Sequence, residues 1–72
     1  MKTEEILKKE IVESRMELAL LMNNASQNMG DLEFEELEAK VRQIHIYDLN
    51  KDFEMSLSET NKLVEKLKNE LE

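Results

Sequence analysis

The sequence predicts an all-α fold, a small antiparallel bundle of two or three helices. None of its 72 residues is proline and only one is glycine, whereas glutamate, leucine, lysine and methionine, which favour helices, are abundant. Apolar residues make up 40% and charged residues 38% of the chain, a balance that suits amphipathic helices better than disorder. Cysteine is absent, so disulfides and thiolate metal sites cannot support the modest core of so short a chain. We therefore expect residues 1–72 to form a single helical domain that is stabilised by helix packing or by association.

The first helix is expected over residues 3–24. Thr3 is suited to the N-cap, and Glu4 and Glu5 follow in the first turn, where carboxylates interact favourably with the helix dipole. One side of this helix carries Leu7, Ile11, Leu18, Leu21 and Met22, and Ala25 and Met29 continue the same line beyond residue 24. A second apolar group falls well off that side: Val12, Met16, Ala19 and Leu20. Residues 16–22 are therefore apolar nearly all round, which predicts a helix that is central in a bundle or shared between two copies.

A loop is expected over residues 25–31. This stretch contains the only glycine, Gly30, together with Gln27 and Asn28, and it follows directly after Asn23 and Asn24. Asparagine favours turns and glycine permits left-handed backbone, so the composition is typical of a helix connection. Asp31 is expected to cap the helix that follows.

The second half of the chain carries two apolar stripes. The first, on a helix expected over residues 32–47, consists of Phe34, Leu37, Val41 and Ile44. The second alternates threes and fours like the a/d seam of a packed helix: Ile46, Leu49, Phe53, Leu57, Thr60, Val64, Leu67 and Leu71. At 100° per residue the two stripes lie roughly 140° apart around a helix axis.

Two arrangements satisfy both stripes. The chain can bend between His45 and Asp52, which gives a third helix at about residues 49–71. Alternatively, one continuous helix buries its far half against a different partner. The poor helix formers of residues 43–52 favour the bend, and the absence of proline and glycine there favours continuity. We favour the bend, and hence three helices.

The formal net charge of −7 limits the partners that the chain can bind. Nucleic acid and anionic membranes are not expected as direct partners, because both require clustered lysine and arginine. No stretch is long or apolar enough to span a bilayer, and the N-terminus lacks the apolar segment of a signal peptide. These features predict a cytoplasmic protein whose natural electrostatic complement is a basic protein surface.

No catalytic, cofactor or metal motif stands out, so we do not expect an enzyme, a cofactor or a metal. The expected function is a non-enzymatic, small, acidic helical module for protein–protein interaction, acting as a regulator, adaptor or assembly subunit. Its partner would be another protein or a second copy of itself. The residues expected to pack are Leu49, Phe53, Leu57, Val64 and Leu67. The candidate partner-binding residues are Met16, Leu20, Ile46, Tyr47, Leu49 and Phe53.

Two alternative functions follow from the acidic residues. Residues 48–59 resemble the twelve-residue calcium loop of EF-hand proteins, with possible oxygen ligands at Asp48, Asn50, Asp52, Ser56 and Glu59. Phe53 occupies the sixth position, where that family has glycine. The resemblance therefore implies a degenerate EF-hand-like protein that binds a target helix, mostly without calcium. The second alternative is an acidic inhibitor that imitates nucleic acid, which requires carboxylates spaced along one exposed face.

Overall fold

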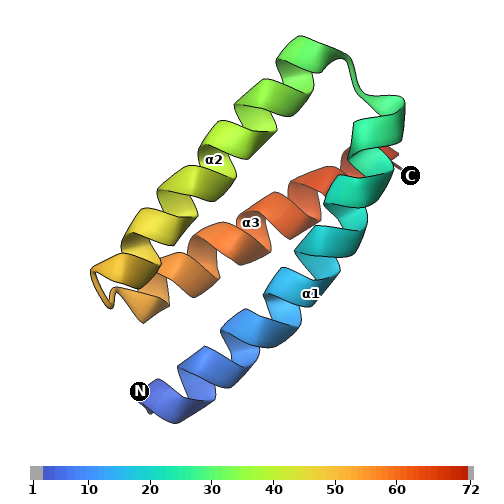
Figure 1. Cartoon of the computed structure of the whole chain (residues 1–72). Coiled ribbons are helices and arrows are strands. Elements are labelled where there is room, and N and C mark those ends of the chain that lie inside the picture. Colours follow the sequence, from blue (N-terminus) through green and yellow to red (C-terminus); the bar gives the residue numbers. More distant parts are fainter. Residues whose placement is uncertain (1–2, 72) are drawn as a thin grey trace.

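Three α-helices and no β-strand make up residues 3–71, the part of the chain that the computed structural model describes. They are α1 (Glu4–Asn28), α2 (Asp31–Leu49) and α3 (Phe53–Leu71). Successive helices run antiparallel, and α3 lies between α1 and α2 (Figure 1). Helix α3 packs against both neighbours, which contact each other little. The predicted all-α bundle is confirmed, with three helices. Within the described residues no helix has the length and apolar character needed to cross a membrane.

Helix α1 begins where the sequence predicts and ends later than predicted. The Thr3 side chain accepts a hydrogen bond from the backbone N–H of Ile6 at 3.3 Å, and so caps the helix. The loop predicted at residues 25–31 is wrong, because the helix continues to Asn28. Ala25 lies on the core face and is fully buried, at 0% exposure. The amide side chain of Asn28 donates to the Asn24 carbonyl at 2.9 Å, so this amide bonds along the helix instead of stabilising a turn.

The connection between α1 and α2 consists of Met29 and Gly30 alone. Gly30 is the N-cap of α2 and has an extended backbone, with φ −68° and ψ 159°, that any residue can adopt. The left-handed conformation that glycine would permit is therefore not used. Asp31 is the first residue of α2 and not its cap, so that expectation is also wrong. In the first turn the Asp31 carboxylate still lies at the favourable end of the helix dipole.

The chain reverses between α2 and α3 through a Schellman motif. The backbone N–H of Asp52 donates to the Tyr47 carbonyl at 2.9 Å, and that of Lys51 donates to the Asp48 carbonyl at 3.0 Å. Lys51 adopts the left-handed conformation, with φ 59°. These bonds satisfy carbonyls at the end of α2 and turn the chain back on itself. The bend therefore replaces the continuous helix, with α2 ending at Leu49 and α3 beginning at Phe53.

This reversal divides the predicted seam between two helices. Ile46 and Leu49 fall on α2 and point away from the core, with exposures of 47% and 82%. The prediction that Leu49 packs is wrong, because the seam assumed a helix that runs through residues 50–52. The rest of the seam lies on α3, where its central positions are buried as predicted: Leu57, Thr60, Val64 and Leu67.

Two apolar clusters form the core, and α3 contributes to both. The larger cluster comprises Leu18, Ala25, Leu37, Ile44, Leu63, Val64 and Leu67. The smaller one, at the N-terminal end of α1, comprises Leu7, Ile11 and Leu57, with Phe53 packed against it. Burying one leucine side chain fully stabilises a fold by about 1.5–3 kcal/mol. Because α1 and α2 contact each other little, most of this stabilisation depends on α3.

A polar network between the two apolar clusters links all three helices. The Arg15 guanidinium of α1 donates to the Asp48 carboxylate of α2 at 2.8 Å. It also donates to the hydroxyl oxygens of Ser56 at 2.9 Å and Thr60 at 3.1 Å, both on α3. Ser56 donates in turn to Asp48, and Thr60 donates to the Ser56 carbonyl at 2.7 Å. Ser56 and Thr60 are fully buried, and among the described residues no buried side-chain nitrogen or oxygen lacks a partner.

The left-handed Lys51 predicts a stabilising substitution. We expect Lys51→Gly to raise the free energy of unfolding by about 0.5–1 kcal/mol, because glycine adopts this conformation without a Cβ clash. Urea denaturation followed by circular dichroism measures the change. Lys51→Ala is the control, since it removes the charge and keeps the Cβ. An equal gain in both variants would assign the effect to charge and contradict the backbone explanation.

The polar network predicts a destabilising substitution. We expect Arg15→Met to lower the free energy of unfolding by about 2 kcal/mol, because it leaves the carboxylate and buried hydroxyls short of a donor. The same denaturation measurement applies. Lys62→Met is the matched control, since Lys62 pairs with Glu59 at 3.7 Å on an exposed surface, and we expect a change within about 0.5 kcal/mol. Equal losses in the two variants would show that the network does not hold the helices together.

Candidate protein-binding surface

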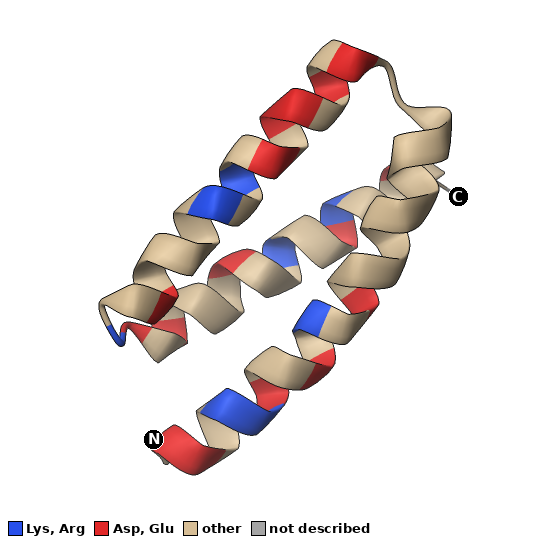
Figure 2. Cartoon of the chain, in the orientation of Figure 1, with Lys and Arg blue, Asp and Glu red and all other residues tan. Residues whose placement is uncertain are grey.

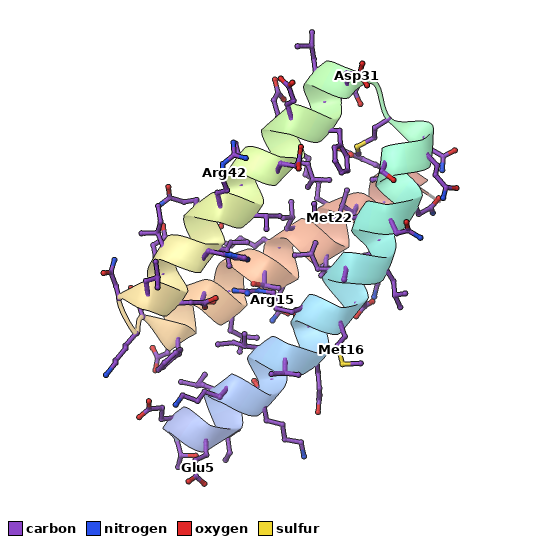
Figure 3. The ribbon with its side chains drawn as sticks, in the orientation of Figure 1. Glu5, Arg15, Met16, Met22, Asp31 and Arg42 are labelled. Atoms are coloured by element: carbon purple, nitrogen blue, oxygen red, sulfur yellow. The ribbon has the colours of Figure 1, made fainter. Side chains whose placement is uncertain are left out.

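The side of α1 that faces away from the core carries an exposed apolar row. Val12, Met16 and Leu20 succeed one another at intervals of four residues, with exposures of 59%, 65% and 74%. At 100° per residue Met16 lies roughly 160° around the helix from the buried Leu18. Figure 3 shows the Met16 side chain pointing away from α2 and α3, and Arg15 pointing toward them. We call this surface the α1 outer face, which is formed by Val12, Met16, Ala19, Leu20, Asn23 and Gln27, all exposed.

The C-terminal half of this face carries no charge. Residues 18–30 include no aspartate, glutamate, lysine, arginine or histidine, in a chain in which 38% of residues are charged. Figure 2 shows this part of α1 as a continuous uncharged segment that leads into the connection to α2. Charged residues are depleted at the centres of protein interfaces, because burying an unpaired charge is costly. The sequence predicts a helix up to residue 24 and a loop from residue 25, because of the asparagines and the glycine, and the length of the charge-free run is the signal that identifies residues 18–28 as a helical surface.

Ion pairs engage several of the charges on the N-terminal half of α1. Glu17 pairs with Lys68 of α3 at 2.5 Å, and Glu4 pairs with Lys8 along the helix at 3.3 Å. The Glu17 carboxylate is thereby directed toward α3 instead of toward the outer face. The helix is fixed beneath its outer face by the two core clusters and by Arg15. A partner would therefore meet a preformed helical surface.

Ile46 and Leu49 form a separate exposed pair on the last turns of α2. Helix α2 lies on the opposite side of α3 from α1 (Figure 1), so a single partner helix cannot contact this pair and the α1 outer face together. The structure thus brings Met16 and Leu20 together, and Ile46 and Leu49 together, on two different surfaces.

Tyr47 is half-buried at the edge of a groove between α2 and α3. The groove has a volume of about 370 Å³, and its lining consists of Lys40, Gln43, Ile44, Tyr47, Glu59, Lys62, Leu63 and Lys66. Hydrogen bonding to Lys66 and repulsion between the two ammonium groups lower the pKa of Lys40. The apolar floor of this groove consists of Ile44 and Leu63, which already belong to the core. The groove therefore follows the seam between two packed helices, and its apolar floor offers a ligand little further surface to bury.

Phe53 is half-buried against the core and is not part of the α1 outer face. It packs against the smaller core cluster, and the Lys8 ammonium lies 5.3 Å from the centre of its ring. This cation covers part of the ring that a partner would otherwise contact. Phe53 is therefore placed to stabilise the junction of α1 and α3.

Residues 48–59 do not form a single calcium-binding loop. They span the end of α2, the connection and the first two turns of α3. The Asp48 carboxylate bonds to Arg15 and Ser56, and the positive φ falls on Lys51 and not on Phe53. Within residues 3–71 no group of three or more histidine, aspartate or glutamate side chains is arranged to hold a metal ion.

All the carboxylates of α2 except Asp48 lie in its N-terminal half (Figure 2). They are Asp31, Glu33, Glu35, Glu36 and Glu38. At 100° per residue Asp31, Glu35 and Glu38 fall within about 60° of one another, and Glu33 and Glu36 lie on the other side of the helix. The row along one face therefore holds three carboxylates over about two turns, whereas imitation of a phosphate backbone needs carboxylates spaced along a whole exposed face.

Comparison of the chain with models of known protein families, with curated proteins and with solved structures finds no significant match. The function is therefore argued from the geometry of the chain itself.

Leucine-to-alanine substitutions on the core face and on the outer face of α1 are expected to differ strongly in their effect on stability. We expect Leu18→Ala to cost about 2–4 kcal/mol of unfolding free energy, because Leu18 is only 2% exposed. Leu20→Ala, two residues away, is expected to change it by less than about 0.5 kcal/mol. Urea denaturation in dilute solution, where association does not contribute, tests both. A large loss for Leu20→Ala would mean that its side chain supports the fold and is not free for a partner.

Proposed function

We propose that this protein is a non-enzymatic helical interaction module that binds another protein chain through the α1 outer face. The observation that carries the proposal is the row of Val12, Met16 and Leu20, which is more than half exposed and continues into a charge-free helical surface. Single exposed apolar residues are ordinary on protein surfaces, but an aligned row on a well-packed helix is typical of a contact site. In this role the protein would act as a regulator, adaptor or assembly subunit in the cytoplasm.

The chemistry of the face favours a helix as the bound element. Its apolar residues recur at intervals of four, which matches the ridge that one helix offers to the groove of another. Asn23 and Gln27 continue the same line and can donate and accept hydrogen bonds beside the apolar contact. Burying the exposed parts of three side chains of this size would contribute roughly 1–2 kcal/mol each. The face therefore suits a modest interface.

The packing of α1 supports the proposal energetically. Binding does not have to order this helix, because Leu7, Ile11 and Leu18 fix it to α3 on the opposite side. The conformational entropy lost on association is then limited to the side chains of the face. Methionine at the centre, Met16, can adjust its rotamers to the surface that it meets.

Site-specific photo-crosslinking in the native host tests the proposal. A photoreactive amino acid in place of Met16 or Leu20 is expected to give covalent adducts with another protein chain. The control carries the same amino acid in place of Glu65, an exposed residue of α3, and is expected to give none. Absence of adducts at both outer-face positions, or equal adducts at position 65, would contradict binding through this face.

A further inference from the structure

We infer that the chain bound by the α1 outer face is a second copy of this protein, with the two α1 helices crossing antiparallel near Leu20. This inference rests on the proposed function and specifies its partner. The crossing places the charge-free halves of the two helices against each other and brings Leu20 against Leu20 of the second copy.

Electrostatics restricts where two copies can meet. Each chain carries a formal charge of −7, so two copies repel each other over most of their surfaces. Residues 18–30 form the longest run of the chain without charge. Leu20 lies in this run with 74% of its surface exposed, beside the exposed Ala19, Asn23 and Gln27. Two copies that meet here bury apolar surface without bringing their carboxylates together.

The charges on the N-terminal half of α1 select the antiparallel orientation. A parallel pair would set Lys9 and Glu13 beside the same residues of the second copy, like charge against like. An antiparallel crossing at Leu20 sets Glu13 opposite Gln27 of the second copy, because both lie at equal distances from Leu20. A glutamine amide can donate a hydrogen bond to a carboxylate. The resulting contact is isologous, which is the commonest symmetry of a dimer.

The side chains at the crossing permit close approach. Ala19 adjoins Leu20 on the outer face, and its small side chain lets the facing helix come near. Interaxial distances of packed helices depend on the size of the side chains at the contact. Met16 then lies beyond the crossing point, where its flexible thioether can fill the space left beside the second helix.

Sedimentation at several protein concentrations tests the inference. We expect wild-type chain to form a dimer at high concentration, and Leu20→Glu to raise the dimer dissociation constant at least about tenfold by burying a charge at the symmetry axis. Leu32→Glu is the matched control, because Leu32 is equally exposed at 78% but lies on α2, outside the face. This variant is expected to dimerise like the wild type. A wild type that stays monomeric up to millimolar concentration, or equal weakening by both variants, would overturn the inference.

Salt and thiol chemistry provide two further readouts. Added salt should strengthen the dimer, because it screens the repulsion between the two acidic chains and no ion pair spans the contact. The chain has no cysteine, so Leu20→Cys introduces one unique thiol. Mild oxidation is expected to link this variant into a disulfide dimer far faster than the Leu32→Cys control. Equal linking rates for the two thiols would count against the crossing at Leu20.

These outcomes are separable from those of the proposed function. A photo-crosslink at Leu20 that joins two copies supports both statements. A crosslink at Leu20 to a different protein, with a strictly monomeric wild type in sedimentation, overturns the second copy and leaves the interaction module intact.

Discussion

The guanidinium of Arg15 fixes how the three helices lie against one another. Hydroxyl groups buried between helices are tolerated only when their hydrogen bonds are made, and Ser56 and Thr60 are both fully buried. Arg15 reaches both hydroxyls from α1 and holds the Asp48 carboxylate of α2 at the same time. A planar group with several donors suits such a position, because it can satisfy acceptors on two other helices in one geometry. Sliding any helix by one turn would break these bonds, so the network defines the register that the apolar clusters then stabilise.

This register determines which surfaces the molecule can offer. With α3 between its two neighbours, α1 is covered mainly along one side. Arg15 points inward and Met16 outward (Figure 3). Leu18 is buried in the core, and the residues at intervals of four from Val12 must then point outward. The apolar outer row is a consequence of a helix with two apolar sides in a fold that has room for one of them. Neither α2 nor α3 is placed to cover it.

Local signals in the sequence predicted much of the fold, and the errors have physical causes. The Thr3 cap depends on a contact within one helix, so the residue type at the helix start predicts it. The seam from Leu57 to Leu67 lies on one continuous helix, so the spacing of its apolar residues is enough to predict which of them are buried. The position of the reversal at Lys51 could not be read, because Schellman motifs usually place glycine or asparagine at the left-handed residue. Asn50 stands one residue too early. Helix α1 extends four residues beyond its predicted end at residue 24, because Ala25 packs in the core and the helix continues to Asn28. The sequence suggested a loop there because a helix rich in asparagine has the composition of a loop.

The candidate partner-binding residues show the same contrast between signals within one helix and signals that cross the reversal. Met16 and Leu20 were identified because they fall off the core stripe of their own helix, which is a local property. Ile46, Leu49 and Phe53 were grouped by the spacing of one continuous seam, with Tyr47 added because it adjoins Ile46. The reversal sends these residues to two helices and three environments. The Arg15 network was missed because Arg15 stands more than thirty positions before each of its partners, Asp48, Ser56 and Thr60. Polar residues at core-facing positions, Arg15 on α1 and Thr60 within the seam, were the available signals. Two such interruptions on helices expected to pack together indicate hydrogen bonding between them, because neither could be buried alone.

The charge-free run can be interpreted in the same way, from the cost of burying a charge. More than a third of the residues in this chain are charged, but none of the thirteen consecutive residues 18–30 is. A partner can therefore cover this part of α1 without burying an unpaired charge.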